Sequence, residues 1–115
     1  MEPSDHIPLT EPTTFILLSL LAGPQHGYAI LKDVQTLSDN RIVLSTGTLY
    51  GALKRLLDLD WIIRKDAQDT DIQTNGRGQK VYALTEKGRQ IFSAEITRME
   101  KLVGVSRLRN AGELP

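Results

Sequence analysis

The 115-residue sequence contains no cysteine, two histidines and few aromatic residues (5%). Without cysteine the chain has no disulfide, no thiolate metal site and no cysteine nucleophile, which fits a reducing compartment. No apolar run reaches the length of a membrane span, so we expect a cytoplasmic protein with no membrane partner. Neither His6 nor His26 is accompanied by paired carboxylates or a glycine-rich phosphate loop. We therefore expect no enzyme, no catalytic residue, no metal site and no cofactor.

An excess of charge of one sign is also lacking, because 14 basic residues balance 14 acidic ones. This balance argues against indiscriminate binding to nucleic acid. The charges are unevenly spread: residues 1–40 carry one basic and five acidic residues, residues 41–80 carry seven and five, and residues 81–115 carry six and four. We expect the middle and the end of the chain to face an anionic partner.

The central stretch, residues 45–57, predicts a helix that begins at a hydroxyl cap, Ser45. Its apolar residues recur at i, i+3, i+4 and i+7, namely Leu49, Ala52, Leu53 and Leu56. The opposite side carries Gly47, Gly51 and Lys54. Glycine destabilises a helix by about 1 kcal/mol relative to alanine, so two exposed glycines indicate a partner that approaches the backbone closely. A nucleic-acid backbone is one such partner.

The rest of the chain predicts further helices around this one. We expect a helix from Thr10 to the break at residues 23–24, which is the hub of the core, and a second from Gln25 to Leu37. Residues 38–40 are typical of a turn and residues 41–44 of a small strand. Residues 61–65 and 79–84 predict two further strands, which a polar loop joins into a hairpin.

Three helices followed by a hairpin is the order of a winged helix-turn-helix, in which the third helix enters a DNA major groove and the hairpin tip lies along a phosphate backbone. The predicted fold class is mainly α with a small β-hairpin and a C-terminal dimerisation helix. We expect a flexible lead at residues 1–9, the DNA-binding domain at residues 10–84, and the dimerisation helix and tail at residues 85–115. The predicted DNA contacts are Ser45, Thr46, Gly47, Thr48, Tyr50, Gly51, Lys54, Arg55, Arg77 and Lys80.

Within this set, Lys54 and Tyr50 are assigned to the major groove and its rim, and the hydroxyls near the helix start to phosphates. Arg77 and Lys80 would contact the backbone from the wing. The partner is therefore expected to be double-stranded DNA.

Three segments of the chain resemble the marker segments of the PadR family of transcriptional regulators. They run over residues 20–30 with His-Gly-Tyr, 47–56 with Gly-Thr-Leu-Tyr, and 81–88 with Tyr-x-Leu-Thr-x-x-Gly. The resemblance implies a dimeric winged-helix repressor that binds inverted-repeat operators and, in several members, responds to a small-molecule effector or stress signal. Asp60 and Trp61 depart from the pattern, since the family more often has glycine and leucine there. With one helix after the hairpin, the chain resembles the short branch of the family.

The last predicted helix carries a heptad-like apolar seam after a cap at Thr85. The residues expected to form a homodimer are Phe92, Ile96, Met99, Leu102 and Val103. Two-fold symmetry through these helices predicts a palindromic operator. The alternative is that the whole stripe docks on its own domain.

Two other interpretations stay open. A winged-helix module that binds protein without direct DNA binding fits the neutral charge, and weak salt dependence would distinguish it. Trp61 and Phe92 are candidates to line a site for an aromatic effector, although two such residues are more often part of a core.

Overall fold

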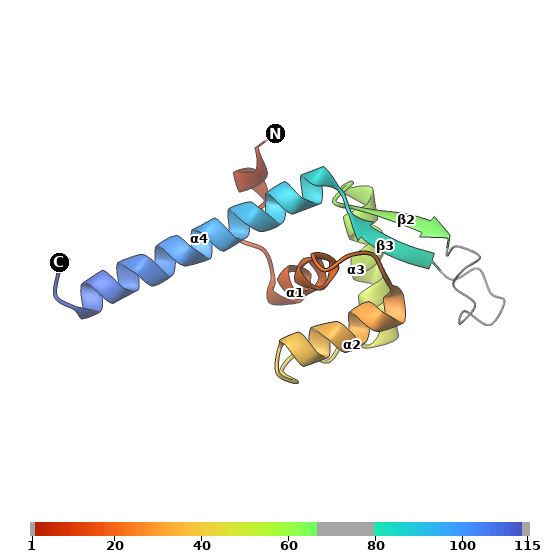
Figure 1. Cartoon of the computed structure of the whole chain (residues 1–115), viewed down its shortest axis with the longest axis horizontal. Helices are drawn as coiled ribbons and strands as arrows, with labels where there is room; N and C mark the ends of the chain where they lie inside the picture. The colour runs from red at the N-terminus through yellow and green to blue at the C-terminus, as the bar shows by residue number, and fades with distance from the viewer. Residues whose placement is uncertain (1, 67–79, 114–115) are drawn as a thin grey trace.

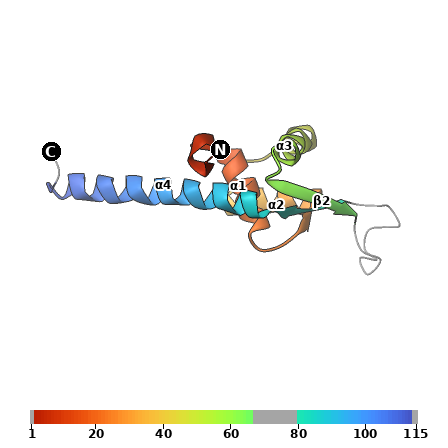
Figure 2. The ribbon, with the colours of Figure 1, turned by 90° about the horizontal axis from the view of Figure 1, so that it is seen from above.

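The structure, a computed structural model, describes residues 2–66 and 80–113. Its elements are η1 (Pro3–His6), α1 (Glu11–Leu20), β1 (Gln25–His26), α2 (Gly27–Leu37), α3 (Thr46–Asp58), β2 (Ile62–Asp66), β3 (Lys80–Leu84) and α4 (Glu86–Asn110). The predicted order of three helices, a hairpin and a last helix is confirmed. Helices α1–α3 and the sheet form a body from which α4 extends to one side (Figure 1). The perpendicular view shows α4 running straight away from that body (Figure 2).

The helix starts follow from hydroxyl residues that satisfy backbone N–H groups. Thr10, Ser45 and Thr85 each accept a hydrogen bond from the backbone N–H three residues later. All three caps were predicted from the sequence, and the helix after Ser45 ends at Asp58, one residue beyond its predicted end. Local chemistry therefore sets the boundaries of the helices that matter for the site.

The segment 41–44, predicted as a small strand, is not a strand. It is a connector between α2 and α3, in which Ile42 and Leu44 pack against the core while Val43 is exposed. The Ile42 N–H donates to the side-chain oxygen of Ser38 at 2.9 Å. Alternating apolar residues therefore reflect one-sided packing here, without a neighbouring strand to pair with.

The sheet has three strands in the order β1-β3-β2, one more than the predicted two-stranded hairpin. The hairpin is confirmed, with Ile62 opposite Leu84 and Arg64 opposite Tyr82. The added strand is β1, in which Gln25 pairs with Tyr82. The sequence placed Gln25 and His26 in the second helix, because two residues are too few to show a strand pattern.

One hydrophobic core joins α1, α2, α3, the sheet and the first turns of α4. It consists of Ile16, Leu17, Leu20, Ile30, Val34, Leu49, Ala52, Leu53, Leu56, Trp61, Ile62, Tyr82, Ile91 and Phe92. The predicted central position of α1 is confirmed, since α1 packs against α2, β3 and α4. Both Trp61 and Phe92 are buried in this cluster, which favours their reading as core residues.

The described part of the lead, residues 2–9, is packed, which its polar sequence did not predict. The turn η1 lies against α4, and the His6 ring stands edge-on to the Trp61 ring with centroids 5.3 Å apart. The Leu9 N–H donates to a carboxylate oxygen of Glu95 at 3.1 Å. The lead is thereby attached to the middle of α4.

Glu95 is fully buried at this attachment, with 0% of the residue exposed. Arg98 donates to both of its oxygens, at 2.7 and 3.1 Å. Hydrogen bonding from Arg98 holds the pKa of the Glu95 carboxyl below its usual value, against the opposing effect of burial, and the Leu9 N–H adds to the lowering. The buried carboxylate is therefore kept charged and fully partnered.

The two halves of α4 have different surroundings. Ile91 and Phe92 are buried in the core, and Ile96 packs against it. Every residue from Lys101 to Asn110 is exposed, including Leu102 (61%) and Val103 (46%). The alternative that the whole apolar stripe docks on its own domain is therefore wrong, and the predicted seam divides between the core and the surface.

The base of α4 is tied to the end of α3. The Thr85 side chain donates to the Asp60 carbonyl at 2.7 Å, and its N–H donates to the Trp61 carbonyl at 3.0 Å. Gly88 follows in the first turn and packs on the same Trp61 carbonyl. These contacts fix the direction in which α4 leaves the body.

Candidate nucleic-acid interface

The exposed side of α3 is a stripe of four residues, Gly47, Gly51, Lys54 and Asp58. It lies opposite the buried leucines because these positions recur at intervals of three and four. No described atom outside the local chain lies within 4 Å of where a Cβ on Gly47 or Gly51 would stand. Packing within the described chain therefore gives no reason for glycine at either position.

Hydroxyl groups gather at the start of α3, as predicted. The Ser45 oxygen accepts from the Thr48 N–H at 3.1 Å, and the Ser45 hydroxyl donates to the Thr48 side-chain oxygen at 2.9 Å. This arrangement uses the Ser45 proton within the cap and leaves the Thr48 hydroxyl proton to point elsewhere. Thr46 is exposed beside them.

Tyr50 is half-exposed at one edge of the stripe, and its hydroxyl lies against Gly27 at the start of α2. A side chain at Gly27 would occupy the space of the phenol group. The ring is thus positioned by a contact between two of the marker segments.

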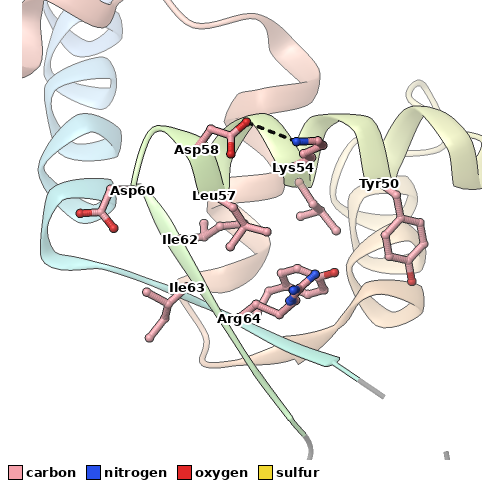
Figure 3. A pocket seen from close by; sticks show the side chains of 10 residues that line it. Tyr50, Lys54, Leu57, Asp58, Asp60, Ile62, Ile63 and Arg64 are labelled. Atoms are coloured by element: carbon pink, nitrogen blue, oxygen red, sulfur yellow. Dashed lines mark ion pairs between the residues drawn. The ribbon is translucent and has the colours of Figure 1, made fainter. Parts of the chain in front are cut away.

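Between α3 and the sheet lies an open hollow of about 710 Å³. Figure 3 shows Lys54 and Asp58 along its rim and Arg64 projecting from β2. Lys54 Nζ lies 3.7 Å from Asp58 Oδ2, and both side chains are mostly exposed. Asp60, in a left-handed conformation (φ 66°), also lines the hollow. The surface beside the helix therefore carries charges of both signs.

Arg64 and Tyr82 are members of this surface that the sequence analysis missed. They face each other across β2 and β3. Burial raises the pKa of the Tyr82 hydroxyl above its usual value, with nearby Tyr50 adding to the rise and the Arg64 cation opposing it. The alternating pattern of the sequence placed both residues on the predicted strands. Their position next to α3 depends on how the hairpin packs on that helix, which the sequence does not show.

On the other edge of the stripe a second hollow, of about 540 Å³, lies between α3 and the start of α1. Gly47, Gly51, Thr48 and Arg55 line it together with Thr13. The predicted residues on α3 therefore border two hollows rather than one continuous face.

The wing is described only in part. Lys80 is exposed at the start of β3, opposite Asp66 in the strand register. Arg77, the other predicted wing contact, lies outside the described residues. The structure therefore brings together the predicted residues of α3 but leaves the wing contacts as predictions.

Two kinds of feature are missing from the described part of the chain. Within residues 2–66 and 80–113 no three acidic or histidine side chains are grouped so that they could hold a metal ion. No helix in those ranges combines the length and apolar character needed to cross a bilayer.

The family model described as the transcriptional regulator PadR-like family matches residues 16–94, which is more than half of the chain. The chain belongs to this family. Its members are DNA-binding transcriptional regulators and not enzymes. Family membership thus confirms the predicted class of this PadR-like protein.

Solved structures agree with the assignment. The chain is similar to a transcriptional regulator from Clostridium thermocellum, with 25% identity, a TM-score of 0.67, and coverage of 84% of this chain and 86% of that one. A PadR family regulator from Clostridium difficile R20291 shows 26% identity and a TM-score of 0.64, with coverage of 88% and 97%. Bacillus subtilis PadR in complex with operator DNA shares the fold, with 24% identity, a TM-score of 0.62, and coverage of 73% and 46%. The predicted winged-helix fold class is confirmed.

A curated relative is an uncharacterized 37.1 kDa protein in transposon TN4556 of Streptomyces fradiae, with 36% identity over 89 residues. The match covers 77% of this chain but 23% of that protein. The PadR-like chain thus spans about a quarter of the length of this relative.

Proposed function

We propose that this PadR-like protein is a repressor that binds a palindromic operator as a homodimer. The observation that carries the proposal is the exposed α3 stripe, in which Gly47 and Gly51 have open space around them. A helix without side chains at two exposed positions is thinner on that side, so its backbone can approach a base edge or a phosphate. The major groove, about 12 Å wide, admits such a helix.

Each predicted contact has a chemical role in this proposal. Lys54 enters the groove, and Tyr50 binds at its rim. Thr48 donates its remaining hydroxyl proton to a phosphate, whereas Ser45 mainly orders the helix start, because its own proton is used in the cap. Thr46 and Arg55 bind phosphates on either side, Gly47 and Gly51 admit the backbone, and Arg77 and Lys80 bind it from the wing.

The homodimer is supported by the second half of α4. Leu102, Val103, Val105 and Leu108 are each 42–61% exposed on a part of the helix that extends beyond the body. Contiguous exposed apolar side chains favour association, and a helix of this kind pairs with a second copy of itself. Phe92 and Ile96 pack on their own domain. The proposed seam therefore begins at Met99 and continues through Leu102 and Val103.

Two further expectations belong to this proposal. A cytoplasmic location is supported by the absence of cysteine from the sequence. A small-molecule effector is supported only by the family resemblance, since Trp61 and Phe92 are both buried in the core.

A second candidate function, a module that binds another protein, is favoured by one observation. The only cation of the α3 stripe is paired with Asp58, so the stripe itself carries no net positive charge. Binding of DNA and binding of protein differ in their salt dependence, because only the neutralisation of phosphates releases counterions.

The test is selection of random double-stranded DNA by the purified protein at moderate salt, followed by sequencing and light scattering for the oligomeric state. The expected result is a dimer that enriches a palindrome with half-sites about one helical turn, or a multiple of it, apart. Lys54→Glu should abolish binding, whereas Lys87→Glu, an equal charge change in the first turn of α4, should retain it. Equal binding by wild type and Lys54→Glu, or no enrichment by a folded dimer, would contradict the proposal.

A further inference from the structure

Lys54 and Asp58 are opposite charges one helical turn apart on the exposed stripe of α3. Their Nζ and Oδ2 atoms are 3.7 Å apart, with 77% and 70% of the side chains exposed. Both lie on the rim of the hollow between α3 and β2 (Figure 3). An exposed pair at this spacing contributes little to folding, because water screens it on all sides. The pair is therefore free to exchange its partners when the helix binds.

Insertion of α3 into a DNA groove would change the environment of the Asp58 carboxylate more than that of Lys54, because Asp58 carries the same charge as DNA. The carboxylate would approach a surface of phosphates, and a desolvated carboxylate is unfavourable unless a hydrogen-bond donor faces it. In the major groove such donors are the amino groups of cytosine N4 and adenine N6. Asp58 thus makes binding conditional on the base that it meets.

The separation of the Lys54 and Asp58 side chains limits which base pair they can contact together. Guanine presents acceptors at O6 and N7, and its paired cytosine presents the N4 donor beside O6. Because O6 and N4 are hydrogen-bonded to each other, they lie about 2.9 Å apart. The donor and acceptor of the protein pair have a comparable separation of 3.7 Å. One ammonium and one carboxylate can therefore meet both atoms of the same base pair.

We propose that Lys54 and Asp58 together read one G·C base pair in each half-site, and that Asp58 is a specificity-determining residue. Lys54 donates to guanine O6 or N7, and Asp58 accepts from cytosine N4. An A·T pair with adenine in the place of guanine reverses this polarity, since its adenine amino group would face Lys54 and its thymine O4 would face Asp58. In the opposite orientation, thymine has no acceptor equivalent to guanine N7 and presents its methyl group to Lys54 instead. The inference rests on the proposed function, since it requires α3 to enter the major groove.

The experiment measures dissociation constants, by fluorescence anisotropy, for the palindromic duplex that the wild type selects and for duplexes with each G·C pair replaced by A·T. For wild type, replacement of one G·C pair per half-site should lower the affinity by roughly 10-fold or more, within the range of a bidentate contact. An inosine·cytosine pair at that position should bind like G·C, because it differs only in the minor groove. Asp58→Asn should reduce the loss at that pair to about 3-fold or less, since an amide can both donate and accept.

The matched control is Asp39→Asn, which removes the same charge from an exposed turn. Asp39 has a φ of 57°, a conformation that asparagine adopts readily. For Asp39→Asn, each G·C to A·T replacement should lower the affinity by the same factor as for wild type. If Asp58→Asn instead changes the affinity for all duplexes by the same factor as the control, Asp58 acts only through net charge and the inference is wrong. If wild type selects no sequence at all, the proposed function itself fails, which is a different result.

Discussion

Two pairs of glycines in this molecule occupy opposite surroundings. A Cβ on Gly88 would collide with the backbone carbonyl of Trp61, and one on Gly27 would collide with the Tyr50 hydroxyl. Around Gly47 and Gly51 the described chain leaves open space. All four glycines belong to the marker segments of the family, so these segments combine residues that the fold requires with residues that only an external partner explains. Single glycine-to-alanine substitutions, each of which adds one methyl group, can distinguish the glycines that the fold requires from those that a partner requires.

The largest expected effect is that of Gly88→Ala. The added methyl meets a backbone carbonyl that cannot rotate away, and the displacement would break the Thr85 N–H bond to the same carbonyl. We expect the free energy of unfolding to fall by about 3 kcal/mol, measured by denaturant titration. Gly104→Ala, in the exposed half of the same helix, is the control and should stabilise the protein. Similar stabilities of the two variants would show that the collision is not real.

Gly51→Ala should separate folding from binding. Alanine in an exposed helix position should stabilise the free protein by about 1 kcal/mol. The same methyl should keep the backbone away from DNA and weaken operator binding by about 10-fold, equivalent to about 1.4 kcal/mol. Chemical denaturation and anisotropy titration measure the two quantities. A stabilised variant with unchanged affinity would remove Gly51 from the interface.

Gly27→Ala should have a smaller effect on folding than Gly88→Ala, although the collision is comparable. The group it meets is the end of the half-exposed Tyr50 side chain, which can rotate into solvent. We expect a loss of about 1 kcal/mol in unfolding free energy, and Tyr50→Phe in the same chain should recover part of it. If the double variant is no more stable than Gly27→Ala alone, Tyr50 is not the obstacle.

The smallest expected effect is that of Gly47→Ala. The position lies in the first turn of α3, where helix propensity has less weight than in the middle. We expect a gain of about 0.5 kcal/mol, visible as a modest rise in melting temperature. A decrease would indicate that the cap formed by Ser45 and Thr48 needs the freedom of glycine.

The sequence predicted those parts of the fold that depend on neighbouring residues. The caps at Thr10, Ser45 and Thr85 need only a hydroxyl three residues before a backbone N–H, and the leucine stripe of α3 needs only its own periodicity. The residues of the α3 stripe were predicted for the same reason.

The parts that the sequence did not predict depend on contacts between distant residues. Strand β1 exists because Gln25 reaches Tyr82, and Glu95 is buried because Leu9 and Arg98 both donate to it. Arg64 adjoins α3 only after the hairpin folds back on that helix. Conversely, residues 41–44 have the composition of a strand but no partner, so local propensity was overruled by tertiary packing.

The hydrogen bonds of Thr85 at the base of α4 affect the spacing between the two half-sites that a dimer could bind. With its 25 residues, α4 is about 37 Å long, so a tilt of about 5° at its base moves the far end by about 3 Å. That displacement is close to the rise of one base pair, about 3.4 Å. In the proposed dimer, the angle set by the Thr85 bonds to Asp60 and Trp61 would act as a gauge of half-site spacing. Relatives with other residues at this joint would then read similar half-sites at a different separation.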